Sequence, residues 1–139
     1  MWPSTRSRLG TASYRSSYHH CEGRRARALI DTQQTMDAYI HDLINRGDYS
    51  RHYSDDVVVD VRGTDQRYRG REAAKNWVEG IHAVGEIKVR NTFMGETHAV
   101  AEAELVRKDG ISVPYSVIYD VAAGKITALR LYFTGPVQP

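Results

Sequence analysis

Apolar residues recur at helical spacing over two stretches of the chain. In the first stretch, the apolar positions fall three or four residues apart, as on one face of a helix; they are Met36, Tyr39, Ile40, Leu43 and Ile44. Gly47 then ends the helix. Asp31 and Gln34 have the spacing of a capping box, which predicts that this helix begins near Asp31 or Thr32. A second helix is predicted over residues 71–82, with its apolar face made by Ala73, Ala74, Trp77, Val78 and Ile81.

Most of the remaining chain alternates between apolar and polar residues or is rich in β-branched residues, as strands are. Residues 48–54 are short and aromatic and predict one or two further helical turns. The predicted strands cover residues 57–61, 66–69, 87–93, 99–107, 111–121 and 125–133. Helices followed by a meander of long strands indicate an α+β fold, with the helices packed on one face of an antiparallel sheet.

The register of one hairpin decides which side chains share a face. A three-residue connection at Lys108-Asp109-Gly110 pairs Glu102 with Ser116, whereas a two-residue turn pairs Glu102 with Val117. A slip of one residue turns every side chain of a strand to the other face. We favour the three-residue connection because it gathers alanine, valine and tyrosine side chains on one coherent apolar face.

Composition places the chain among ordinary globular proteins. Its 139 residues suffice for one domain, and 41% of them are hydrophobic and 26% charged. No stretch reaches the roughly 20 apolar residues that a membrane span needs, so no membrane partner is expected. The single cysteine, Cys21, excludes an intrachain disulfide and fits a reducing compartment, so we expect a cytoplasmic protein.

Charge divides the chain at residue 30. Residues 1–30 carry six arginines and one glutamate, a net charge of +5, whereas residues 31–139 carry a net charge of −3. The first part has no apolar period and predicts a disordered basic extension, whose composition also matches an organelle transit peptide. The second part is the predicted domain, and its mildly acidic balance gives no reason to expect nucleic acid as a partner.

Motifs for metals and cofactors are missing from the sequence. His19, His20 and Cys21 are adjacent, but no second ligand pair stands at the spacing of a zinc site. The sequence contains no HExxH, phosphate-binding loop or GxGxxG pattern either. We therefore expect no metal and no cofactor.

Three stretches of the chain resemble a known superfamily. They are Asn45-Arg46-Gly47-Asp48; residues 54–60, followed by Tyr68-Arg69-Gly70-Arg71-Glu72-Ala73; and residues 124–133. In this order they resemble the nuclear transport factor 2-like (NTF2-like) superfamily, which includes ketosteroid isomerase, SnoaL-like polyketide cyclases and limonene epoxide hydrolase. The resemblance covers residues 32–136. It implies a cone-shaped, curved antiparallel sheet with helices on its concave face, open to an apolar cavity.

The resemblance also implies a catalytic carboxylate. Asp60 falls at the position of the proton-shuttling aspartate of the isomerases, where an apolar wall would raise its pKa. The two oxyanion donors of those enzymes fall on Ile40 and Ser116. Tyr39, Ser116 and His98 are therefore the candidates for stabilising a developing oxyanion. A strand-end aspartate that only accepts hydrogen bonds from a turn is the alternative for Asp60.

The resemblance further predicts which residues face the cavity. The expected substrate-binding residues are Ile40, Trp77, Glu102, Glu104, Ile118, Leu129, Leu131 and Phe133. Glu102 and Glu104 share one face of their strand, and a solvated or dimer-facing row is their alternative role. The outer face would carry Tyr115, Val117, Tyr119 and Tyr132 and form a homodimer, the commonest arrangement of oligomers.

These assignments predict a cofactor-independent enzyme. It would abstract a proton beside the carbonyl group of a small hydrophobic or polyketide-like molecule and cause isomerisation, cyclisation or dehydration, with Asp60 as the base. Two alternatives stay open. One is a hydrolase that activates water with Asp60, Glu102 and Glu104; the other is a protein that binds a small ligand without catalysis.

Overall fold

The computed structural model describes residues 3–137, with side chains described from residue 23 on. Its first element is the helix α1 (Pro3–Ile44), which begins well before the predicted start at Asp31. Asp31 is therefore no cap: inside the helix, its carbonyl accepts a hydrogen bond of 2.9 Å from the Thr35 hydroxyl. The sequence pattern predicted disorder before residue 31, whereas α1 begins at Pro3. Extending a formed helix costs little, because each added residue gains a local backbone hydrogen bond.

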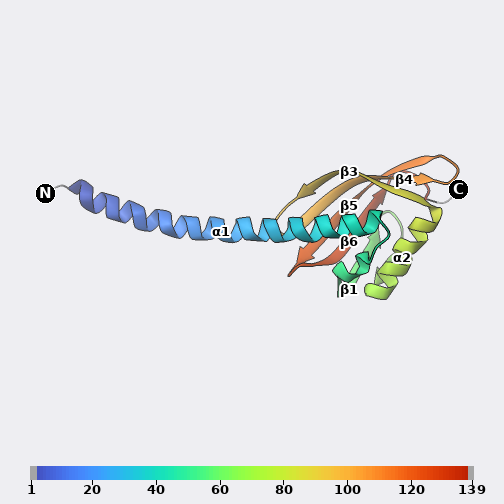
Figure 1. Ribbon diagram of the computed structural model, residues 1–139, viewed down its shortest axis with the longest axis horizontal. Helices are drawn as coiled ribbons and strands as arrows, with labels where there is room; N and C mark the ends of the chain where they lie inside the picture. Colours follow the sequence, from blue (N-terminus) through green and yellow to red (C-terminus); the bar gives the residue numbers. More distant parts are fainter. Residues whose placement is uncertain (1–2, 138–139) are drawn as a thin grey trace.

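Only the C-terminal part of α1 packs on the rest of the molecule, and its N-terminal part extends far beyond the sheet (Figure 1). Met36, Tyr39 and Leu43 point into the core, as their spacing predicts. Leu29 and Ile30, one turn before the packed part, are exposed. Whether residues 1–30 form a unit separate from the domain stays a prediction.

The elements that follow α1 agree closely with the sequence pattern. They are η1 (Tyr49–His52), β1 (Tyr53–Val61), β2 (Arg67–Arg69), α2 (Arg71–Val84), β3 (Gly85–Met94), β4 (His98–Arg107), β5 (Ser112–Ala122) and β6 (Lys125–Phe133). Both helices cover one face of a curved sheet, which is not closed into a barrel (Figure 1). The α+β cone expected from the resemblance is confirmed.

The sheet is mixed rather than antiparallel throughout. Its strand order is β2-β1-β6-β5-β4-β3, and β1 pairs with β6 in parallel. The prediction of an antiparallel sheet is wrong at this one pair. Consecutive strands joined by hairpins are antiparallel, but β1 and β6 are joined through the whole domain and nothing in their connection constrains their direction.

The register at the β4–β5 hairpin is the predicted one. Glu102 pairs with Ser116 and Ala103 with Tyr115, so the connection is the three-residue Lys108-Asp109-Gly110. The resulting apolar face lies against the helices and forms the core. We call this the inner face of the sheet. The opposite, outer face carries Asp60, Glu102, Glu104, Ser116, Ile118, Asp120, Arg130 and Tyr132.

Candidate functional site

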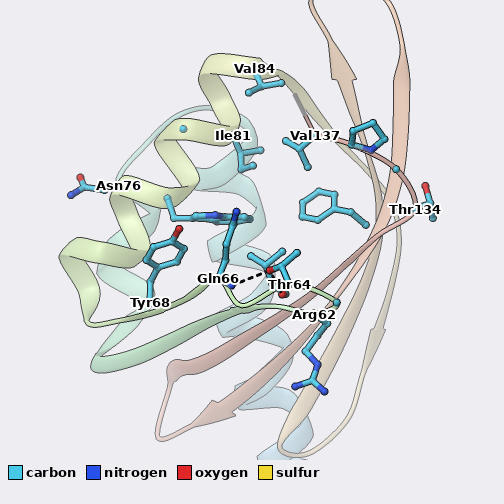
Figure 2. A pocket seen from close by; sticks show the side chains of 16 residues that line it. Arg62, Thr64, Gln66, Tyr68, Asn76, Ile81, Val84, Thr134 and Val137 are labelled. Carbon is cyan, nitrogen blue, oxygen red and sulfur yellow. Dashed lines mark hydrogen bonds between the residues drawn. The ribbon is translucent and has the colours of Figure 1, made fainter. Parts of the chain in front are cut away.

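A pocket of about 770 Å³ opens between α2, the end of β1 and the chain that follows β6. One wall is α2, which contributes Trp77, Ile81 and Val84. A second wall is Val61 with the turn that joins β1 to β2, and a third is Phe133 with residues 134–137. In Figure 2, Ile81, Val84 and Val137 point into the space between α2 and the C-terminal segment.

The β1–β2 turn supplies the polar part of the rim. Gly63 has a φ of 80°, a left-handed conformation that glycine adopts without strain. The Thr64 hydroxyl donates a 2.7 Å hydrogen bond to the Val61 carbonyl and accepts one of 3.0 Å from the Gln66 backbone amide. The turn thereby brings Gln66 and Tyr68 to the pocket, while the Arg62 side chain points away from it (Figure 2).

The pocket has an aromatic and aliphatic floor. The rings of Trp77 and Phe133 are 6.4 Å apart, and Phe133 stacks on Tyr115 at 4.8 Å. Below them the cone is almost filled, because only about 20 Å³ remains between α1, α2 and the inner face. That small void is bordered by Tyr39, Tyr115, Tyr119, Leu129, Leu131 and other core residues. A ligand can therefore enter the open pocket but not the closed end of the cone.

Tyr39 is part of a buried tyrosine cluster at this closed end. Its hydroxyl lies 2.8 Å from that of Tyr53, and its ring packs edge-on against Tyr119. Burial raises the pKa of Tyr39, Tyr53 and Tyr119 well above the ordinary value, so all three hydroxyls stay protonated. Tyr39 is a potential hydrogen-bond donor, but it does not line the open pocket.

Asp60 is not where the resemblance placed it. Val59 and Val61 point into the core, so Asp60 between them lies on the outer face. Its carboxylate accepts a 3.1 Å hydrogen bond from Arg62, and its strand partner is Arg130. The inward position at the end of β1 belongs to Val61. The predicted contact of Asp60 with an apolar cavity is therefore wrong, since successive residues of a strand face opposite sides.

The other polar candidates also lie on the outer face. Glu104 pairs with Arg90 at 2.8 Å, and this contact lowers the pKa of the glutamate. His98 lies 3.1 Å from Asp120, whose carboxylate also accepts two hydrogen bonds from Arg130. Glu102 and Ser116 are cross-strand partners there. The alternative of a charged row away from the cavity is the one that the structure adopts for the glutamates.

Four predicted cavity residues do lie on the inner side. Trp77 and Phe133 line the open pocket, and Leu129 and Leu131 border the void beneath it. Ile118 was assigned to the same face as the leucines, but Leu129 pairs with Tyr119, so Ile118 lies outside. Ile40 is half-buried on α1 and does not line the pocket.

The outer face also differs from the predicted dimer surface. Tyr115, Val117 and Tyr119 are buried beneath the helices, and only Tyr132 of that set points outward, 42% exposed. The sequence pattern correctly predicted a coherent apolar face, but the face was assigned to the wrong side. Covering it with the chain's own helices removes more apolar surface from water within one protomer. A homodimer stays a prediction.

Sequence reasoning missed several residues that shape the pocket. Val61, Tyr68, Ile81, Val84 and Val137 were not named as site residues, although each lines it. Alternation along β1 could have identified Val61, because it shares a face with Val57 and Val59. Nothing in the sequence indicated that the chain after β6 folds back to form a wall.

Metal ligands and membrane-spanning segments are not found in the described part of the chain. Among these residues, no group of three or more histidine, cysteine, aspartate or glutamate side chains could hold a metal ion. His19, His20 and Cys21 lie outside the residues whose side chains are described. No helix in the same part of the chain is both long and apolar enough to cross a membrane.

Several solved structures that match this fold are described as NTF2-like proteins. An NTF2-like protein of unknown function from Mesorhizobium loti is 18% identical, with a TM-score of 0.69 over 77% of this chain and 93% of that one. A provisionally assigned ketosteroid isomerase from Kribbella flavida is 16% identical, with a TM-score of 0.70 over 80% and 83%. A provisionally assigned SnoaL-like polyketide cyclase from Jannaschia sp. CCS1 is 15% identical, with a TM-score of 0.63 over 76% and 86%.

These similarities establish the NTF2-like fold of the chain. Identities of this size do not establish a reaction, because one fold carries many unrelated functions. No protein-family model and no curated protein matches the sequence.

Proposed function

We propose that this protein, which has the NTF2-like fold, binds a small and largely apolar molecule in the open pocket. A volume of about 770 Å³ lies in the usual range of small-molecule sites, roughly 300–1,000 Å³. Trp77, Ile81 and Phe133 provide apolar walls, and transfer of apolar surface from water to such walls favours binding. Tyr68 and Gln66 at the rim can hydrogen-bond one carbonyl or hydroxyl group of the ligand.

The observation that carries this proposal is the chemistry of the pocket wall. None of the 16 described lining residues is an aspartate, glutamate, histidine, lysine or cysteine. Arg62 at the rim is the one charged member, and its guanidinium pairs with Asp60 on the outer side. A wall without a proton acceptor favours an uncharged ligand and binding without proton transfer at carbon.

The enzymatic alternative is isomerisation, cyclisation or dehydration of a small carbonyl or polyketide-like compound. The provisional names of the Kribbella and Jannaschia proteins support it by analogy of fold. It requires a base within hydrogen-bond reach of the substrate, and Asp60 is separated from the pocket by the sheet. Binding without catalysis therefore explains the pocket with fewer assumptions.

Gly80 offers a direct test of the pocket. It lines the opening from α2, and a Cβ atom added to it would meet no atom within 4 Å. We expect Gly80→Phe to occupy the pocket and weaken binding of an uncharged fluorescent probe, N-phenyl-1-naphthylamine, by tenfold or more. Gly80→Ala is the matched control, and its affinity should stay within about twofold of the natural chain, since a methyl group takes little of this volume.

Two results would contradict the proposal. One is a probe affinity that Gly80→Phe leaves unchanged. The other is turnover: conversion of a β,γ-unsaturated ketone to its conjugated isomer, lost in Gly80→Phe and kept in Gly80→Ala, would establish catalysis in this pocket. Absorbance of the conjugated product measures that conversion directly.

A further inference from the structure

The chain after β6 forms one wall of the pocket without belonging to the sheet. We call residues 134–137 the C-terminal strap. The strap follows Phe133 and has no helix or strand of its own. In Figure 2 it passes opposite α2, so that Val137 faces the same space as Ile81 and Val84. A wall that lacks sheet hydrogen bonds needs other contacts to hold its place.

Hydrogen bonds at two points, together with the packing of Val137, hold the strap in place. At its start, the Thr134 backbone amide and hydroxyl donate hydrogen bonds of 3.2 Å and 2.7 Å to the Pro114 carbonyl. Further along, the Arg107 guanidinium donates a hydrogen bond of 3.4 Å to the Pro136 carbonyl. Val137 packs against the edge of the core. The side chain of Arg107 thus supplies the one described side-chain hydrogen bond to the strap beyond Thr134.

Arg107 is an unusual residue for a purely structural contact. It is only 7% exposed, although buried arginines are rare. Asp109 of the β4–β5 hairpin pairs with one end of its guanidinium. Its Nε atom has no hydrogen-bond partner among the described residues. Burying a charged group with an unpaired N–H costs stability, which calls for a reason beyond the fold.

From these contacts we infer that Arg107 is a positioning residue for the pocket: it holds the strap closed over the bound ligand. The inference rests on the proposed ligand site. Arg107 does not itself line the pocket; it acts through Pro136, which does. When the Arg107 side chain is replaced, residues 135–137 are held only by Thr134 and Val137, and the wall opposite α2 opens more often. Ligand then dissociates faster, because a bound molecule leaves through the opened wall.

The test compares Arg107→Gln with Asp109→Asn in the full chain. Both substitutions remove the ion pair between Arg107 and Asp109, but Asp109→Asn leaves the hydrogen bond from Arg107 to Pro136 in place. We expect Arg107→Gln to raise the dissociation rate of N-phenyl-1-naphthylamine about fivefold or more. Asp109→Asn should lower the melting temperature while the dissociation rate stays within about twofold. Equal changes of dissociation rate in both variants would overturn the positioning role.

A double-mutant cycle with Val137→Ala shows whether Arg107 acts through the strap. If it does, Val137→Ala has less effect on the dissociation rate once Arg107 is replaced, and the two changes combine to less than their product. If the two substitutions instead multiply in their effects on the dissociation rate, Arg107 does not act through the strap. Arg107→Lys, which keeps the charge but not the planar fork, should behave like Arg107→Gln in dissociation and be closer to the natural chain in melting temperature.

A readout without ligand separates this inference from the proposed function. Trp77 lines the pocket beside Phe133, and Trp2→Phe leaves Trp77 as the single tryptophan. Acrylamide should quench its fluorescence more strongly in Arg107→Gln than in Asp109→Asn, whether or not any probe binds. Failure of probe binding with unequal quenching contradicts the ligand site alone, whereas equal quenching contradicts the strap.

Discussion

The two faces of the sheet are made by the same strands and differ in what they can do. The inner face is apolar, lies against two helices and ends at an open pocket. The outer face carries the carboxylates and the histidine that sequence reasoning assigned to chemistry; ion pairs hold Asp60 and Glu104 there, and His98 contacts Asp120. Reactive residue types and an open pocket are both present, but on opposite sides of the sheet. Residue type alone is therefore a poor guide to a site.

Adjacent residues of β5 give the largest expected contrast between the faces. Val117 is 3% exposed on the inner face, and Ser116 is half-buried on the outer face. Val117→Asn should lower the free energy of unfolding by about 3 kcal/mol or more, because it buries an amide without partners and removes apolar packing. Ser116→Asn should change it by less than about 1 kcal/mol. Urea denaturation of both variants measures this; equal losses would mean that the faces are assigned wrongly.

Two glycines, one within the covering helix and one at its end, sharpen the comparison. A Cβ atom at Gly85 would lie 2.1 Å from the Val106 carbonyl oxygen, so α2 enters β3 in direct backbone contact with β4. Gly85→Ala should cost about 2–3 kcal/mol, the upper range for overpacking. Gly80→Ala should stabilise the protein by up to about 1 kcal/mol, because alanine favours a helix and the Cβ meets no atom. Thermal unfolding of the two variants measures both changes in stability. Changes of the same sign for Gly85→Ala and Gly80→Ala would contradict this packing.

Acid should affect the inner side through His82. The imidazole is 6% exposed, and burial followed by the charge of Arg46 lowers its pKa; Glu79 acts in the opposite direction. The unfolded chain therefore binds a proton more readily than the folded one. Stability should therefore fall as the pH drops below the unfolded pKa of about 6.5. His82→Gln should flatten the stability profile between pH 7 and 5, and an unchanged slope would exclude His82 as its cause.

Asp60→Asn should have the smallest effect. The carboxylate pairs with Arg62, whose side chain is 51% exposed, and such pairs contribute about 0–1 kcal/mol. Probe affinity should stay within about twofold of the natural chain, since Asp60 does not line the pocket. Equilibrium titration with N-phenyl-1-naphthylamine measures this affinity. A tenfold loss of affinity or of any turnover would restore Asp60 to the site.

The sequence predicted the elements and one register well, because these depend on local rules. The predicted strand over residues 125–133 has the same two ends as β6, and the three-residue hairpin pairs Ala103 with Tyr115 as expected. Alternation defines two faces of each strand but does not say which one the helices cover. That choice depends on the helices and the β5–β6 register together. The pattern of β5 therefore placed Tyr119 on the apolar face and still left the side of that face undetermined.

The pocket was predictable only in part. The resemblance to the NTF2-like superfamily predicted that Trp77 and Phe133 face the cavity, and both line the pocket. Asp60 was misplaced because neighbouring strand residues face opposite sides, so an offset of one residue exchanges Asp60 for Val61. The strap was not predictable at all, because Arg107 and Pro136 are joined by a contact between distant parts of the chain.

Methyl NMR gives the most direct test of the central claim, that the ligand site lies on the inner side of the sheet. Isoleucine and valine methyl groups report on both sides: Ile81, Val84 and Val137 surround the pocket, and Val100 and Ile118 lie on the outer face. On titration with N-phenyl-1-naphthylamine, we predict intermolecular Overhauser effects from the probe to the first three residues. Contacts to Val100 and Ile118, with none to the pocket residues, would contradict the account.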